Sequence, residues 1–185
     1  MNVLGISGSL RRGSHNTSLL RAAAELLPDG VELELWDGLK AVPPYDEDDD
    51  VEPAPAAVAQ LRDTIAGADA ILFATPEYNH SVPGQLKNAI DWASRPLATN
   101  PLRNKPVAVV GASMGAFGAV WAQAELRKVL AATGARVVEG EVAVGHAHQK
   151  FDADGRLTDE TLRETLAEVV DALVTVTRAR DLLAA

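Results

Sequence analysis

The residues with the clearest chemical potential follow the first apolar run of the chain, in the segment Gly5–Ser18, which reads GISGSLRRGSHNTS. Glycines, hydroxyl side chains, an asparagine and two guanidiniums supply N–H and O–H donors and positive charge. A phosphate monoester fits such a segment where a strand gives way to a helix. The segment lacks the lysine of a Walker A loop and the glycine spacing of the dinucleotide fingerprint. An ordinary polar turn that caps the next helix explains this segment, taken alone, about as well.

A second polar segment, Ala74–Gly84, follows another apolar run and reads ATPEYNHSVPG. Its prolines and glycine make the chain path stiff, so the segment can hold backbone N–H and C=O groups at fixed positions. A planar ring that carries both donors and acceptors would fit against it, and Tyr78 can stack on or border that ring. A rigid turn that leads into the next helix is the plain alternative.

The third segment, Gly111–Gly115, has the spacing G-x-S-x-G of the nucleophile elbow in α/β hydrolases. In that interpretation Ser113 is the nucleophile of an esterase. A catalytic triad needs a carboxylate and then a histidine further along the chain. His146 and His148 are present, but the only acidic residues between Ser113 and these histidines are Glu125, Glu139 and Glu141, and no HGGG-type oxyanion segment occurs. A glycine-rich turn against a bound ligand explains the segment equally well.

These segments are positioned by an alternation of strands and helices. Short continuous runs of Val, Ile, Leu and Ala indicate buried parallel strands, and we expect them at Asn2–Ser7, Val31–Trp36, Ala70–Thr75, Pro106–Gly111 and Arg136–Val144. Helical apolar faces lie between them and after the last, with Pro83 in a first turn, Gly134 as a helix stop and Thr158 as an N-cap. The pattern predicts a doubly wound α/β sheet.

Composition narrows the classes of function. The 185 residues fit one domain, residues 1–185, and 47% of them are hydrophobic. The chain has no cysteine, which excludes disulfides, thiolate metal sites and thiol redox catalysis. Its net charge of −9 disfavours nucleic acid as a partner. No apolar run long enough for a membrane and no signal-peptide pattern occur, so we expect a cytoplasmic protein.

Two smaller features are expected to carry no chemistry. His146 and His148 have metal-ligand spacing but no third ligand, so we expect no metal site. The acidic cluster Asp46–Asp50, within the proline-flanked stretch Pro43–Pro55, is expected to be an exposed, solvated loop.

Taken together, the three segments resemble the NADPH-dependent FMN reductase family, which includes bacterial chromate and quinone reductases and azobenzene reductases. The resemblance spans nearly the whole chain, and its middle motif is long and specific. The matching residues are Gly8-Ser9-Leu10-Arg11 with Ser14 and Asn16, then Pro76–Gly84 running into Leu86–Trp92, then Ser113-Met114-Gly115, while Pro43–Asp46 looks like the acidic second loop of that family.

The resemblance implies a flavodoxin-like fold, with a five-stranded parallel sheet of order 2-1-3-4-5, helices on both faces, and FMN at the ends of the first and third strands. By matching position, the FMN phosphate is expected at Ser9, Arg11, Ser14, Asn16, Thr17 and Ser18. The isoalloxazine ring is expected beside Pro76, Glu77, Tyr78 and Asn79, with Ser113 and Gly115 nearby. Family members commonly form dimers or dimers of dimers, which implies a homodimer or homotetramer.

The implied activity is that of an oxidoreductase whose FMN passes electrons from NADPH or NADH to a small acceptor such as a quinone, chromate, an azo compound or flavin. The flavin carries the chemistry, so no residue is expected to act as acid, base or nucleophile. A flavodoxin-type electron carrier is the main alternative, and a serine hydrolase that uses Ser113 is the less favoured one. The aromatic content of 4% argues against an aromatic sandwich over both ring faces, which favours the enzyme over the carrier.

Overall fold

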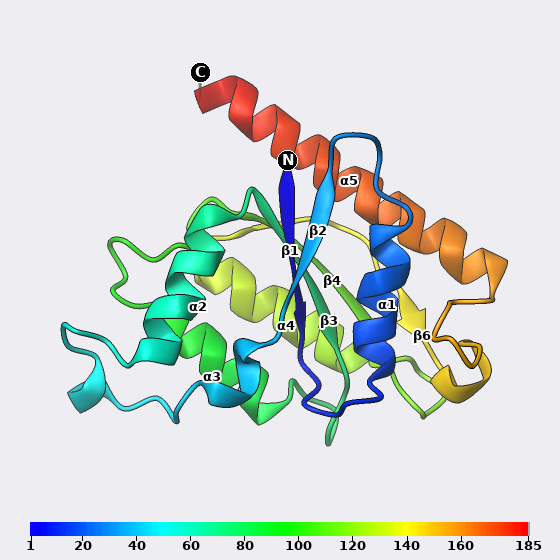
Figure 1. Cartoon of the computed structure of the whole chain (residues 1–185), viewed down its shortest axis with the longest axis horizontal. Helices are drawn as coiled ribbons and strands as arrows, with labels where there is room; N and C mark the ends of the chain where they lie inside the picture. The colour runs from blue at the N-terminus through cyan, green and yellow to red at the C-terminus, as the bar shows by residue number, and fades with distance from the viewer. Residues whose placement is uncertain (185) are drawn as a thin grey trace.

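The computed structural model describes residues 1–184, and a parallel sheet runs through its centre (Figure 1). The strands lie in the order β2-β1-β3-β4-β5, which confirms the predicted order. β3 and β4 are buried at every position, as their uninterrupted apolar runs require. The strands are β1 (Asn2–Ser7), β2 (Glu32–Trp36), β3 (Ala70–Thr75), β4 (Pro106–Ala112), β5 (Arg136–Val137) and β6 (Ala143–Val144).

The fifth position of the sheet differs from the single strand predicted at Arg136–Val144. β5 pairs with the start of β4 and β6 pairs with its end, while Glu139, Gly140 and Glu141 between them are exposed. Two carboxylates in three residues would be costly to bury, so this stretch leaves the sheet. Gly140 has a φ of 130°, which suits the detour, and its carbonyl accepts a hydrogen bond from Arg127 at 2.6 Å.

Helices cover both faces of the sheet, as predicted. α1 and α5 pack on one face, where Leu20 and Leu173 meet Leu72 of β3, and α2, α3 and α4 pack on the other, against Ile71 and Phe73. Successive residues of β3 therefore serve opposite cores, as the pleat of a strand requires. The helices are α1 (His15–Ala24), α2 (Ala56–Gly67), α3 (Gly84–Ala93), α4 (Val120–Ala132) and α5 (Glu160–Ala184), with short 3₁₀ turns η1 (Gly38–Ala41), η2 (Glu47–Asp49) and η3 (Ala147–Gln149).

The start of α5 corrects one prediction. Asp159, and not Thr158, caps the helix, because its Oδ1 accepts the N–H of Leu162 at 3.1 Å. The Thr158 hydroxyl turns back and donates to the carbonyl of Lys150 at 3.2 Å. Hydrogen bonds from the Lys150 ammonium and from the backbone hold the pKa of Asp159 below its usual range.

The acidic second loop is exposed at Asp46–Asp49, as expected, but its ends are fastened. The Asn88 side chain donates to the carbonyl of Pro43 at 2.8 Å and accepts the N–H of Tyr45 at 2.7 Å. Arg62 forms a half-buried ion pair with Asp50 at 2.8 Å. Among residues 1–184, no helix combines the length and the apolar character needed to cross a bilayer.

Candidate functional site

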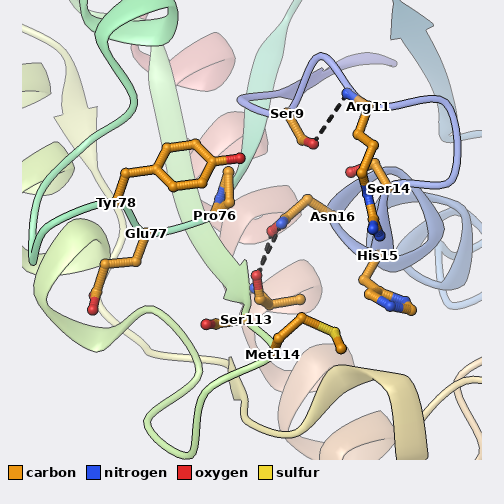
Figure 2. Close-up of a pocket in the computed structure, with 11 residues that line it drawn as sticks. Ser9, Arg11, Ser14, His15, Asn16, Pro76, Glu77, Tyr78, Ser113 and Met114 are labelled. Atoms are coloured by element: carbon orange, nitrogen blue, oxygen red, sulfur yellow. Dashed lines mark hydrogen bonds between the residues drawn. The ribbon is translucent and has the colours of Figure 1, made fainter.

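A cavity of about 220 Å³ opens at the edge of the sheet where β1, β3 and β4 end (Figure 2). The loops that follow these three strands all contribute to its wall, so the three polar segments singled out in the sequence meet at one place. Parallel strands present their carboxyl ends at the same edge, which is the usual ligand position in such sheets. The lining residues are Ser9, Arg11, Ser14, His15, Asn16, Pro76, Glu77, Tyr78, Ala112, Ser113 and Met114.

The first loop ends in a capped helix. Ser14 is the N-cap of α1, and its hydroxyl oxygen accepts the N–H of Thr17 at 3.3 Å. The exposed guanidinium of Arg11 donates to the carbonyl of Gly13 at 2.6 Å, and the Arg11 side chain runs past Ser14 toward His15 in the view of Figure 2. Within residues 1–184, the backbone N–H groups of His15 and Asn16 have no hydrogen-bond acceptor. The loop therefore offers two unused donors and a cation at one helix N-terminus.

Asn16 joins the first loop to the end of β4. Its amide nitrogen donates to the carbonyl of Ala112 at 2.9 Å, and its amide oxygen accepts the N–H of Ala112 at 2.9 Å. Both residues are buried. This pair of hydrogen bonds engages both the nitrogen and the oxygen of the carboxamide, so Asn16 fixes the floor of the cavity between two loops.

The loop after β3 closes in a tight turn. Tyr78 and Ser81 pair through both backbone N–H groups, at 3.2 and 3.1 Å, and the two residues between them, Asn79 and His80, have φ values of 54° and 59°. Asparagine tolerates this left-handed conformation better than most residues. Asn79 therefore stands at the exposed tip and does not line the cavity, whereas the Tyr78 ring reaches across it (Figure 2).

Glu77 connects the same loop to α4. Its Oε2 accepts the N–H of Ala122, in the first turn of α4, at 3.0 Å. The residue at the N-cap of that helix is Ala119, which has no side-chain acceptor. A second contact runs in parallel, because the Ser81 hydroxyl donates to the Glu125 carboxylate. The loop beside the cavity is thus pinned to a helix at two points.

Removing the Glu77 carboxylate is expected to loosen this junction. Glu77→Ala leaves the first turn of α4 uncapped, and we expect the free energy of unfolding to fall by about 1 kcal/mol. Glu77→Gln keeps an acceptor oxygen and should lose about half of that or less. Urea unfolding of the two variants measures both losses. Equal losses would show that the hydrogen bond to Ala122 is not what holds the loop.

The loop after β4 has no arrangement for a serine nucleophile. The Ser113 hydroxyl accepts the N–H of Gly115 at 3.1 Å, and no histidine ring or carboxylate in the described part of the chain hydrogen-bonds it. The backbone N–H of Ser113 donates to the carbonyl of Val144, and its carbonyl accepts the N–H of Ala147, at 3.0 Å each. This rigid, glycine-containing turn forms one wall of the cavity.

Several expected site residues lie outside the cavity wall. Thr17 faces a neighbouring cavity on the other side of α1. Ser18 lies against Gly155, and a Cβ atom added to Gly155 would be 3.1 Å from the Ser18 hydroxyl oxygen. Gly115 is exposed next to Ser113 and accepts the N–H of His146 at 2.9 Å through its carbonyl.

The cavity is also lined by three residues that the sequence analysis did not assign to the cofactor: His15, Ala112 and Met114. Each is adjacent in sequence to an expected site residue, which was the available signal. The ring of His15 stacks on Phe151 with centroids 5.4 Å apart. Burial, and then the nearby Arg11 and His148, lower the pKa of His15. We therefore expect the ring to be neutral at pH 7, which leaves Arg11 as the cation of this wall.

Comparison with known proteins gives one consistent result. The sequence profile described as NADPH-dependent FMN reductase matches residues 1–149. An NAD(P)H-dependent FMN reductase of Pseudomonas aeruginosa is 47% identical over 174 residues, which cover 94% of this chain and 93% of that protein. A quinone reductase of Pseudomonas putida is 40% identical over 171 residues, 92% of this chain and 91% of that one. The solved structure of FerB, a flavoenzyme NAD(P)H:(acceptor) oxidoreductase from Paracoccus denitrificans, superposes with a TM-score of 0.83 at 37% identity, covering 96% of this chain and 97% of that one.

Proposed function

Because this chain belongs to the NADPH-dependent FMN reductase family, we propose that it binds FMN in the cavity at the ends of β1, β3 and β4 and passes electrons from NAD(P)H to a small quinone-type acceptor. The observation that carries the proposal is the convergence of the three polar loops on one cavity. The donors present fit the cofactor, since two unused N–H groups and the Arg11 guanidinium suit a phosphate monoester. FMN, when bound, supplies the redox chemistry by accepting a hydride and releasing electrons.

The residues divide into two tasks in this proposal. Ser9, Arg11 and Ser14 hold the phosphate together with the first N–H groups of α1, and Asn16 positions that helix against β4. Pro76 and Tyr78 border the ring, and Glu77 keeps their loop in place through α4. Ser113 closes the opposite wall. Thr17 and Ser18 lie outside the cavity wall in the first turn of α1, and their N–H groups are already bonded to Ser14, so they would support the turn that holds the phosphate. Asn79 and Gly115, also outside the wall, would act through the backbone of their loops.

An exposed apolar surface beside the cavity supports a homodimer or homotetramer. Met114, Phe117 and Trp121 are 54%, 63% and 42% exposed. The rings of Phe117 and Trp121 pack edge to face with centroids 5.0 Å apart, and the His80 ring packs edge to face on Trp121 with centroids 4.6 Å apart. Contiguous exposed apolar groups of this kind mark contact surfaces. Sedimentation of the purified protein measures the oligomeric state, and a monomer at micromolar concentration would contradict the proposed homodimer or homotetramer.

The activity is tested on the purified protein. We expect a yellow protein that releases FMN, and not FAD, on heat denaturation and that oxidises NADPH or NADH when a soluble quinone is added. A flavodoxin-type carrier would hold FMN without consuming the nicotinamide. A serine hydrolase would instead be labelled at Ser113 by a serine-reactive phosphonate. A colourless protein that fails to bind added FMN would overturn the proposal.

A further inference from the structure

A second cavity, of about 420 Å³, lies on the other side of the first loop, between α1 and the end of β2. Figure 1 shows α1 and β2 as neighbours on this side of the sheet. Ser9 lines both cavities, so the second one adjoins the proposed phosphate site directly. Thr17, which faces away from the first cavity, faces this one.

The second cavity carries two cations that form no salt bridge within the described residues. Arg21 of α1 and Lys40 of η1 both line it, and neither forms a salt bridge within residues 1–184. This is notable in a chain with a net charge of −9, where carboxylates are abundant. Two cations from separate elements that line one cavity together with the Thr17 hydroxyl can bind a multiply charged anion such as a phosphate.

One carboxylate accompanies the two cations. Asp37 directly follows β2, lines the same cavity and forms no salt bridge in the described structure. In doubly wound dinucleotide-binding sheets, an acidic residue after the second strand accepts a hydrogen bond from the ribose 2′-OH of NAD, whereas a nearby cation accommodates the 2′-phosphate of NADP. The second cavity has residues of both kinds, so with a 2′-phosphate held by the cations Asp37 would accept from the ribose 3′-OH. Its loop lacks the glycine pattern of a dinucleotide site.

The hydride donor itself requires such a neighbouring site. If the proposed function holds, the nicotinamide must lie against the flavin in the first cavity, and the adenosine half must extend along an adjoining surface. The hollow beside Tyr78 and Pro83 has one cation, Arg11, which the FMN phosphate would occupy. In the hollow beside His146, Lys150 is already paired with Asp159 at 2.6 Å. Of these three hollows in the described part of the chain, the cavity between α1 and β2 has two unpaired cations.

We propose that the cavity between α1 and β2 binds the adenosine end of NADPH, with Arg21 and Lys40 holding the 2′-phosphate and Asp37 accepting a hydrogen bond from the ribose. This inference rests on the proposed function and adds to it a preference for NADPH over NADH. NADH lacks the 2′-phosphate and gains nothing from the two cations.

The test uses the FMN-loaded protein and two probes that need no turnover. Calorimetric titration with adenosine 2′,5′-bisphosphate and with 5′-AMP compares the same ligand with and without the 2′-phosphate, and the bisphosphate should bind at least about tenfold more tightly. Arg21→Ala and Lys40→Ala should each weaken the bisphosphate by about tenfold and raise the KM for NADPH by a similar factor. The KM for NADH and the kcat with either donor should stay unchanged.

Two controls sharpen the result. Lys128→Ala removes an exposed cation from α4, away from the second cavity, and should change neither probe. Lys40→Arg keeps the charge and should keep most of the preference for adenosine 2′,5′-bisphosphate over 5′-AMP and for NADPH over NADH. Equal binding of the two probes, or equal losses with NADPH and NADH, would overturn the inference. Retained FMN and continued NADH oxidation in that case would leave the proposed function standing, whereas loss of FMN binding in the unmodified protein would remove both.

Discussion

Replacing Asn16 with leucine is expected to lower the free energy of unfolding by about 2–5 kcal/mol, because it removes two buried hydrogen bonds at once. Leucine has a similar size, so the change leaves little empty space. It does strip the N–H and the carbonyl of Ala112 of their partners, at a position that is 2% exposed. Each buried unpaired group costs roughly 1–3 kcal/mol. Urea unfolding of the apoprotein measures the loss.

A matched control separates the effect of losing the buried hydrogen bonds from the effect of changing an amide side chain to leucine. Gln60→Leu makes the same amide-to-leucine change on the exposed side of α2, and we expect a shift within about 0.5 kcal/mol. Asn16→Asp keeps the acceptor for the Ala112 N–H but sets a carboxylate oxygen against its carbonyl. Its stability should recover in part at low pH, where the protonated carboxyl donates as the amide does. A loss below about 1 kcal/mol for Asn16→Leu would contradict the proposed role of the bridge.

Loss of the Asn16 bridge should also affect FMN binding, and in a different way from the loss of a residue that binds the phosphate directly. Asn16 ties the start of α1 to the end of β4, so its loss should displace the phosphate loop and the Ser113 wall together. Affinity for FMN and for riboflavin should then fall by similar factors, since both the phosphate and the ring lose alignment.

The meeting of the three loops could be predicted from the sequence because it follows from a general property of parallel sheets. Once the apolar runs at Asn2–Ser7, Ala70–Thr75 and Pro106–Gly111 are taken as adjacent strands, the segments after them must lie at one edge. The structure pairs β1 with β3 and β3 with β4 in parallel, over five residue pairs each. The apolar helix faces were predicted from the periodic patterns of the sequence, whereas the strand order was implied by the family resemblance and is confirmed by the structure.

What the sequence did not reveal depends on contacts between distant positions. Asn16 reaches Ala112, 96 residues further along, and Glu77 reaches Ala122, 45 residues further along. A local motif shows that an asparagine or glutamate is present but not which backbone group it serves. The break between β5 and β6 has a similar origin, because the apolar run concealed the cost of burying Glu139 and Glu141. The cations Arg21 and Lys40 carry no motif at all, and only the fold brings them to one cavity.

Arg11→Ala is expected to weaken FMN binding by about ten- to a hundredfold while leaving the fold intact. Arg11 is an exposed loop residue that contributes nothing to either core, so its removal should cost little stability. A hydrogen bond from a guanidinium to a charged group is worth about 1.5–3 kcal/mol, and each 1.4 kcal/mol corresponds to a factor of ten in affinity. In the structure the guanidinium donates to the carbonyl of Gly13, which holds it at the cavity and leaves further N–H groups for a phosphate.

Two controls make this prediction specific: riboflavin as a ligand without the phosphate, and Arg12→Ala as a variant of the neighbouring arginine. Riboflavin lacks the phosphate, so its affinity should be nearly the same for Arg11→Ala and the unmodified protein. Arg12 is also exposed but lines neither the first nor the second cavity, so Arg12→Ala should change FMN affinity by less than about threefold. Fluorescence titration of both flavins into each apoprotein gives these ratios, and the FMN loss should shrink as salt is added. If Arg11→Ala weakened both flavins equally, the residue would shape the loop without binding the phosphate, and the phosphate would have to be held by Ser9, Ser14 and the N–H groups of α1.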